Sequence, residues 1–209
     1  MVNKNQKDMY EKSLDNYSIQ EYLELDSQSN KKNEYNSGLI IALVEQTLNH
    51  GIIGNNINSE INGLLKEKDL KCTSINGDVK VYIEKANSYV YPDGMVICGK
   101  IETSEEDENS VINPVLIIEV LSKSTESYDR GNKFHKYCSL KSFCEYVLID
   151  QYKPVIDTLY RADKTYWKMV TTIGLDKSIY LHSIQAHIKM SDIYRNVGKL
   201  DNPQFSLDF

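Results

Sequence analysis

The segment from Pro114 to Leu121 constrains the fold of this 209-residue chain most strongly, because it is almost wholly apolar yet carries one carboxylate, Glu119. A short apolar run of this kind is typical of a central β-strand that is covered on both faces. Side chains alternate between the faces of a strand, so Glu119 is expected on the face of Ile117 and Leu121. Burying a lone carboxylate is costly unless a cation compensates it. The residues alone leave two interpretations open: a metal ligand, or a glutamate paired with a lysine or arginine.

The hydrophobic pattern around this strand predicts helices first and then a run of strands around one further helix. Ser18-Ile19-Gln20-Glu21 has the form of a capping box, which predicts a helix to about Asp26, and Asn36-Ser37-Gly38 predicts a hairpin turn. Further helices are expected at about 49–68, 130–140 and 191–196, and strands at 79–84, 89–98, 114–121, 145–150, 155–161, 165–172 and 178–181. This order favours an α/β (α+β) fold with a mixed central sheet flanked by helices. The expected organisation is a single domain over 18–197, a polar leader over 1–17 and a tail over 198–209.

The overall charge excludes a protein that coats nucleic acid by bulk positive charge. Lys and Arg number 24 against 30 Asp and Glu, which gives a net charge of −6. Five of the acids, however, fall between Glu102 and Glu108, in a stretch expected to be a solvated loop. A local basic groove elsewhere therefore remains compatible with the composition.

The lack of a recognisable targeting signal and the cysteine pattern lead us to expect a cytoplasmic protein. The polar N-terminus lacks the apolar core of a signal peptide, and no apolar run approaches the length of a membrane span. The four cysteines form no CxxC pair and the histidines do not cluster with them, so a structural zinc site is not expected. We predict four buried thiols and no disulfide, since disulfides are rare in a reducing compartment.

Asp93 is the second carboxylate of interest, because it stands between Pro92 and Gly94 inside an otherwise apolar stretch. Pro and Gly on both sides indicate a bend or bulge, which can aim a side chain at a site; an ordinary turn aspartate is the alternative. Carboxylates on two neighbouring strands can share a divalent cation. Mg²⁺ or Mn²⁺ held in this way activates water and stabilises charge on a phosphoryl group.

A basic stretch follows the Glu119 strand. Five bases and two acids lie between positions 123 and 141, the bases being Lys123, Arg130, Lys133, Lys136 and Lys141. A positive stretch beside an acidic metal site suits a polyanionic substrate, although a solvated helix face is the alternative. Lys133 stands out because it falls in the first turn of the helix expected after the Glu119 strand.

These motifs, taken in order, resemble the Uma2 family, which is similar to the PD-(D/E)XK restriction-endonuclease-like nucleases. The resemblance covers about residues 18–197 and rests on Glu34-Tyr35, Gly38, Asn49-His50, Pro92-Asp93, Asn113-Pro114, Glu119-Val120-Leu121-Ser122, Ser124-Thr125, Asp129-Arg130-Gly131, Lys133-Phe134 and the strand 145–150. It implies a restriction-endonuclease-like fold with the site at one end of two adjacent strands. The ordered set is specific, whereas a bare PD…E pair would be weak.

The resemblance also implies a site. Asp93 and Glu119 would be catalytic metal ligands for one or two Mg²⁺ or Mn²⁺ ions, with the Val120 carbonyl as a third ligand and Glu34 as an additional acid. The wider superfamily has a Lys two residues after the second acid, but Leu121 stands there, so Lys133 is the candidate catalytic lysine and Lys123 the fallback.

Further residues are assigned to the substrate. Lys123, Arg130 and Lys136 would contact it and His50 would lie at the rim, while Asp78 is one more candidate acid.

Three functions compete at this point. The first is a metal-dependent endonuclease acting on nucleic acid, with DNA favoured over RNA and with a homodimer as one possible assembly. The second is a nucleic-acid-binding module that kept the fold and lost catalysis, which the absence of a Lys at position 121 favours. The third is an interaction protein whose carboxylates are simply paired with bases.

Overall fold

The centre of the molecule is a six-stranded mixed sheet. The computed structural model describes residues 16–44 and 46–203. The strands of the central sheet run in the order β11 (Trp167–Ile173), β10 (Val155–Arg161), β9 (Glu145–Asp150), β8 (Leu116–Leu121), β6 (Gly94–Cys98) and β3 (Cys72–Asn76). Only β8 and β9 are parallel, and every other neighbouring pair is antiparallel.

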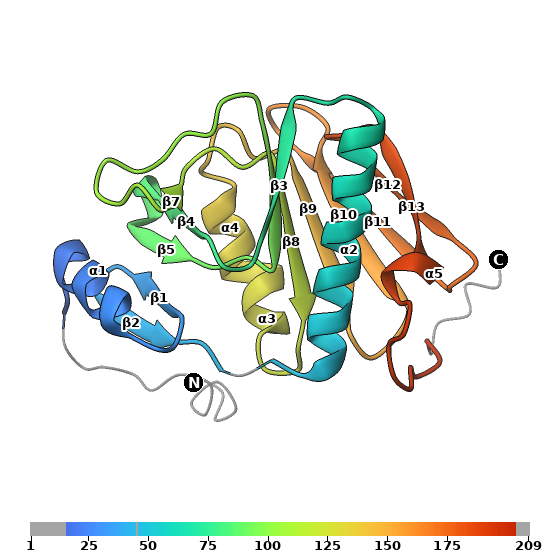
Figure 1. Ribbon diagram of the computed structural model, residues 1–209, viewed down its shortest axis with the longest axis horizontal. Coiled ribbons are helices and arrows are strands. Elements are labelled where there is room, and N and C mark those ends of the chain that lie inside the picture. Colours follow the sequence, from blue (N-terminus) through green and yellow to red (C-terminus); the bar gives the residue numbers. More distant parts are fainter. Residues whose placement is uncertain (1–15, 45, 204–209) are drawn as a thin grey trace.

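Two smaller sheets and several helices surround the central sheet (Figure 1). The second sheet has the order β2 (Leu39–Ala42), β1 (Asn33–Asn36), β5 (Ser88–Val90), β4 (Lys80–Ile83) and β7 (Ser110–Val111). The third contains β12 (Ser178–Leu181) and β13 (Ala186–Lys189). The helices are α1 (Ile19–Gln28), α2 (Leu48–Glu67), the 3₁₀ turn η2 (Glu84–Ala86), α3 (Glu126–Tyr128), the π turn η3 (Asp129–Lys133), α4 (Phe134–Tyr137) and α5 (Met190–Ile193).

The two faces of β8 pack into different cores, as the alternation of its side chains predicts. Leu116, Ile118 and Val120 join the buried face of α2 and the strands β12 and β13. Ile117 and Leu121 pack on the other side, against an aromatic cluster that includes residues of α4 and β9. The central strand is therefore buried on both faces, and every residue of β8 is buried.

Several local predictions are confirmed. Ser18 and Glu21 form the capping box at the start of α1, with Ser18 N donating to Glu21 Oε2 over 2.7 Å. The hairpin of β1 and β2 turns at Ser37 and Gly38, which both have a positive φ. The helix α2 is capped by Thr47, whose hydroxyl oxygen accepts from the backbone N–H of His50 over 3.2 Å.

Other parts of the fold differ from the sequence-based expectation. The strands β3, β7 and β13 are not predicted. The strand expected at 89–98, with an interruption at 92–94, is two strands in different sheets, β5 and β6. The break between them falls at Pro92 and Asp93, where the chain passes from one sheet to the other. The helix expected at 130–140 starts earlier, at Glu126, because α3, η3 and α4 form one continuous helical segment.

The prediction that all four cysteines are free thiols is wrong. Cys72 and Cys98 form a disulfide. They are directly opposite each other in the antiparallel pair of β3 and β6. The sequence pattern predicts no strand at 72–76, so it does not predict this pairing. Cys138 and Cys144 are free and half-buried.

The acidic segment from Glu102 to Glu108 is only partly the solvated loop that was expected. Asp107 accepts from the hydroxyl of Ser110 over 2.5 Å and lies 3.3 Å from the ammonium nitrogen of Lys80.

Residues 1–15 of the predicted leader and 204–209 of the predicted tail lie outside the described residues. Within the described part, no helix is both long and apolar enough to cross a membrane.

Candidate active site

Asp93 is held at the start of β6 by the neighbouring strand β8. Its backbone N–H donates to the carbonyl of Ile118 over 3.0 Å, and its Oδ2 accepts from the backbone N–H of Val120 over 2.7 Å. The next residue must be small, because a Cβ at Gly94 would lie 2.5 Å from the side chain of Asn58 on α2. The Pro-Asp-Gly sequence thus lets the chain change sheets and pack against α2 while its aspartate faces the end of β8.

Gln46, just before α2, and His50, in its first turn, complete the surroundings of Asp93. His50 Nε2 lies 3.2 Å from Asp93 Oδ2, and Gln46 Nε2 donates to Oδ1 over 3.0 Å. The His50 side chain is buried and lines the pocket, where it contacts the Asp93 carboxylate.

Glu119 is buried on the face of Ile117 and Leu121, as predicted. Its Oε1 lies 2.9 Å from the ammonium nitrogen of Lys133 and accepts from the hydroxyl of Tyr137 over 3.1 Å. Both of these contacts use Oε1, so among residues 16–44 and 46–203 no hydrogen bond or ion pair occupies Oε2, the oxygen that remains available to a ligand.

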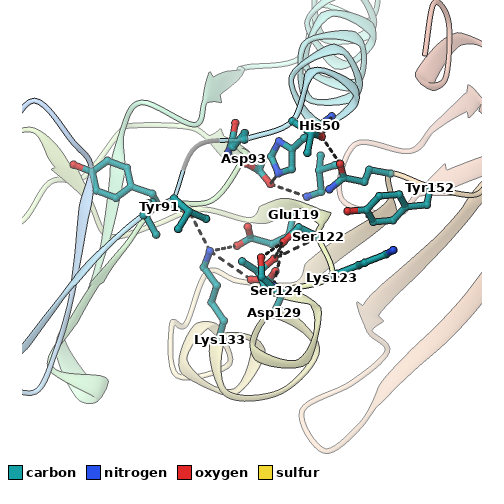
Figure 2. Close-up of a pocket in the computed structure, with 17 residues that line it drawn as sticks. His50, Tyr91, Asp93, Glu119, Ser122, Lys123, Ser124, Asp129, Lys133 and Tyr152 are labelled. Carbon is teal, nitrogen blue, oxygen red and sulfur yellow. Dashed lines mark hydrogen bonds and ion pairs between the residues drawn. The ribbon is translucent and has the colours of Figure 1, made fainter. Parts of the chain in front are cut away.

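Lys133 lies among carboxylates from three different elements, although its side chain is only 6% exposed. Besides Glu119, its ammonium nitrogen is 3.4 Å from Glu34 Oε1 and 3.7 Å from Asp129 Oδ1. It also donates to the backbone carbonyl of Tyr91 over 2.9 Å. Figure 2 shows this ammonium group pointing toward Glu119 from the helical segment below it.

Burial and neighbouring charges shift the pKa values of the buried ionisable residues of this site in different directions. Burial raises the pKa of Glu119 well above its usual value, against the opposing charge of Lys133. Burial alone would lower the pKa of Lys133, but the charges of Glu119 and Glu34 raise it well above its usual value, so the side chain remains an ammonium. Burial would also raise the pKa of Asp93, but the contact with His50 and the N–H of Val120 hold it below its usual value. Burial raises the pKa of Asp129 to about 6.

These residues line one open pocket of about 220 Å³ (Figure 2). Its walls contain Asp93, Glu119, Val120, Lys133 and Asp129 together with the hydroxyl-rich turn after β8, Lys123 and Tyr152. The ammonium nitrogen of Lys123 lies over the ring of Tyr152, 5.2 Å from its centroid. The pocket is open to solvent and has room for a phosphodiester group beside the carboxylates.

Some residues assigned from the sequence lie elsewhere. Glu34 touches Lys133 but does not line the pocket, since its carboxylate accepts from the backbone N–H of Tyr91 over 3.0 Å. Arg130 bridges Glu126 and Asp157, at 2.9 and 2.6 Å.

Two more of the assigned residues also lie away from the pocket. Lys136 donates to the hydroxyl of Tyr128 over 3.1 Å. Asp78 is exposed and paired with Lys32 at 2.7 Å.

Several residues of the site were not assigned from the sequence. Asp129 and Tyr137 lie four residues before and after Lys133, so helical spacing could have found them. Thr47 and Gln151 could not be found in this way, because the hydroxyl of Thr47 bonds to the side chain of Gln151 across 104 positions. Gln151 in turn donates to the carbonyl of Leu121 over 2.8 Å, so it ties the start of α2 to the end of β8.

The donor set suits a hard cation that keeps part of its water shell. Asp93, Glu119 and the peptide oxygen of Val120 are oxygen donors, and Mg²⁺ commonly uses one or two protein carboxylates with water and phosphate oxygens. No group of three or more His, Cys, Asp or Glu side chains among residues 16–44 and 46–203 is arranged to hold a metal ion. These residues do not form a closed structural metal site, so an ion held by the two carboxylates would have to complete its coordination with solvent or substrate oxygens.

A mixed sheet with an acidic pair at the ends of two adjacent strands, β6 and β8, defines the restriction-endonuclease-like class of folds. The model of the Uma2 family, described as "Putative restriction endonuclease", matches residues 19–188. The chain belongs to the Uma2 family, and its fold and family are nuclease-like.

The chain is also similar to known proteins in sequence and in fold. The chain is 30% identical over 181 residues to the protein slr1290 of Synechocystis sp., a match that covers 87% of this chain and 93% of that protein. It is 30% identical over 159 residues to sll1609 of the same organism, covering 76% and 89%. The crystal structure of a "putative nuclease belonging to DUF820" from Anabaena variabilis has the same fold, with a TM-score of 0.69, 18% identity and coverage of 85% of this chain and 97% of that one.

Proposed function

We propose that this protein is a metal-dependent endonuclease that hydrolyses phosphodiester bonds, with DNA as its substrate. The observation that carries the proposal is the convergence of Asp93, Glu119 and Lys133 on one pocket at the adjoining ends of β6 and β8. Membership of a family described as "Putative restriction endonuclease" favours DNA over RNA.

Asp93 and Glu119 would hold one or two Mg²⁺ or Mn²⁺ ions, with the Val120 carbonyl as a further donor. Such an ion, when bound, would polarise the phosphoryl group and lower the pKa of a bound water. Asp93 is suited to this role because its low pKa keeps it anionic at neutral pH. Glu34 is placed to support the site through Lys133, from 3.4 Å, and it would not act as a direct ligand while Lys133 lies between.

Lys133 would act on the reacting phosphate. Its ammonium group is fixed by Glu119 and by the Tyr91 carbonyl, both at 2.9 Å, and it lines the pocket. A positioned cation at the scissile group stabilises the charge that develops in the transition state and orients the attacking water. Since buried carboxylates hold the Lys133 ammonium group in place, this group would not have to move when the substrate binds.

The flanking phosphates would meet a smaller set of groups than the sequence suggested. Of the residues assigned to the substrate, Lys123 and His50 line the pocket, whereas Arg130 and Lys136 do not. Arg130 is held by two carboxylates and Lys136 by a tyrosine hydroxyl, so their contribution would be a weaker, longer-range attraction for the polyanion.

The experiment is cleavage of supercoiled plasmid DNA with Mg²⁺ or Mn²⁺ by the wild type and by Asp93→Asn and Glu119→Gln. We expect nicking by the wild type and loss of cleavage in both variants. Asp78→Asn is the matched control, because this acid is exposed and lies outside the pocket. The proposal fails if the two site variants cleave as well as the wild type, or if all of the proteins are inert on a broad panel of DNA and RNA.

A catalytically inactive nucleic-acid-binding module is the second candidate function. Two observations favour it. Leu121 stands where the wider superfamily has its lysine, and both oxygens of Asp93 already accept hydrogen bonds within the protein. DNA binding that does not need metal and survives Glu119→Gln, without any turnover, would support this candidate over the nuclease.

A further inference from the structure

The strand β11 leaves one long edge of the central sheet open. Within the described residues it pairs only with β10, at the end of the six-stranded sheet (Figure 1). Its middle residues are exposed on both faces, and they include apolar side chains: Met169 is 62% exposed and Val170 49%. Tyr166 and Leu175, next to its two ends, are also exposed. Such an edge is a template for pairing with another strand.

We propose that β11 pairs antiparallel with β11 of a second copy of this chain, which would join two central sheets into one across a two-fold axis. This inference concerns assembly and does not depend on the proposed nuclease activity.

The direction of the backbone groups of β11 follows from the turn that precedes it. Ala162 N donates to the carbonyl of Tyr166 over 3.2 Å, which makes these two residues a hydrogen-bonded pair. Hydrogen-bonded and non-hydrogen-bonded pairs alternate along an antiparallel ladder. Val170, opposite Thr158, therefore directs its N–H and C=O toward β10, and a 3.4 Å contact between the Thr158 hydroxyl and the Val170 carbonyl agrees with this.

The intervening residues point their backbone groups away from β10. These residues are Trp167, Met169, Thr171 and Ile173. They carry the N–H and C=O groups that an added strand would use.

One register satisfies all of these groups at once. If Val170 lies opposite Val170 of the second copy, then Met169 faces Thr171 and Trp167 faces Ile173, each in both directions. Every outward-directed N–H and C=O of the strand then has a partner. The pairing is isologous, so it closes as a dimer and does not propagate into a filament.

The side chains of β11 suit this register. Lys168 would face Thr172 of the second copy, and the two Lys168 side chains would stand four residues apart along the strand, about 13 Å. Lys168 is the one charged residue of β11 and it would face a threonine, so this register opposes no like charges directly. The remaining cross-strand pairs join apolar or β-branched residues, which stabilise sheets. Charge and hydrogen bonding thus favour a second copy as the occupant.

The test is a charge swap at Val170, the position that would face itself. Sedimentation equilibrium over a range of concentrations should show a monomer–dimer equilibrium for the wild type. Val170→Lys and Val170→Glu should each weaken the dimer at least 10-fold, because like charges would be opposed, and an equimolar mixture of the two should restore it. Leu25→Lys is the matched control, since Leu25 is 47% exposed but lies on α1.

A second variant guards against a folding defect at position 170. Met169→Pro removes one outward N–H and leaves the bonds between β10 and β11 in place, and proline is tolerated at such an edge position. It should also give monomers with an unchanged circular dichroism spectrum. A monomeric wild type at all concentrations, or a dimer that persists in Val170→Lys and Met169→Pro, would overturn the proposal.

Discussion

The ammonium nitrogen of Lys133 lies 2.9 Å from Oε1 of Glu119, although the two residues stand on different elements, a helical turn and the central strand β8. Both side chains are buried, so each depends on the other for electrostatic compensation. Removing one member of a buried pair leaves an uncompensated charge, which is far more destabilising than the pair itself is stabilising. The same contact should therefore matter for stability and for catalysis.

Replacement of Lys133 by methionine should impair both properties. We expect cleavage to fall about 100-fold or more, because a fixed cation beside the reacting group is lost. The free energy of unfolding of the metal-free protein should fall by about 3 kcal/mol, because Glu119, Glu34 and Asp129 lose their common partner. Plasmid cleavage and urea unfolding measure the two effects. Lys133→Arg keeps the charge and should retain more of the stability than of the activity; a fully active Lys133→Met would exclude a catalytic role.

His50 should act through Asp93, because His50 Nε2 lies 3.2 Å from Asp93 Oδ2. Groups that orient a metal ligand typically contribute 10–100-fold to metal affinity. We expect His50→Ala to weaken Mg²⁺ binding about 10-fold by calorimetry, with the cleavage rate at saturating Mg²⁺ close to that of the wild type. His187→Ala, an exposed histidine on β13, is the control. An unchanged Mg²⁺ affinity in His50→Ala would show that His50 does not position Asp93.

The main parts of the site could be predicted from the sequence because each has a local signal. An acid inside an apolar run marks Glu119, and proline and glycine around an acid mark Asp93. A buried carboxylate and a bent strand each cost free energy. In both cases the residues next to the acid in the sequence reveal the arrangement. The same holds for the capping box of α1 and for the two-faced burial of β8.

The remainder depends on contacts between distant segments. Arg130 falls in the basic stretch, but its charge is neutralised by Asp157 of β10, 27 positions away. The cysteine pair is set by the register of β3 against β6, and the contact between Thr47 and Gln151 by the way α2 lies on the central sheet. Local patterns contain no information on strand order or register, so composition could suggest a cationic substrate surface but not which cations remain available.

Asp129 predicts a specific dependence of stability on pH. Its pKa in the folded protein is about 6, against a usual value of 3.8, because it is buried. A carboxyl group with a raised pKa favours the folded state at pH values below about 4, and this contribution is lost as the pH rises through 6. Asp129→Asn should therefore be more stable than the wild type at pH 7.5, by on the order of 2–3 kcal/mol, with little difference at pH 3.5.

Thermal or urea unfolding at several pH values measures this difference. Asp78→Asn is the matched control, because pairing with Lys32 lowers the pKa of Asp78 and its replacement should not stabilise the protein at pH 7.5. Equal stabilities of Asp129→Asn and the wild type across this pH range would contradict the assigned effect of burial.

The disulfide between Cys72 and Cys98 should reduce the number of free thiols to two and should stabilise the folded chain. Alkylation of the denatured, unreduced protein should label only Cys138 and Cys144, and prior reduction should raise the count to four. The disulfide spans 26 positions and ties the edge strand β3 to β6, so Cys72→Ser with Cys98→Ser should lower the free energy of unfolding by about 3 kcal/mol. Cys138→Ser is the control for loss of a half-buried thiol. Four labelled cysteines without reduction would show that β3 is held to the sheet by its hydrogen bonds alone.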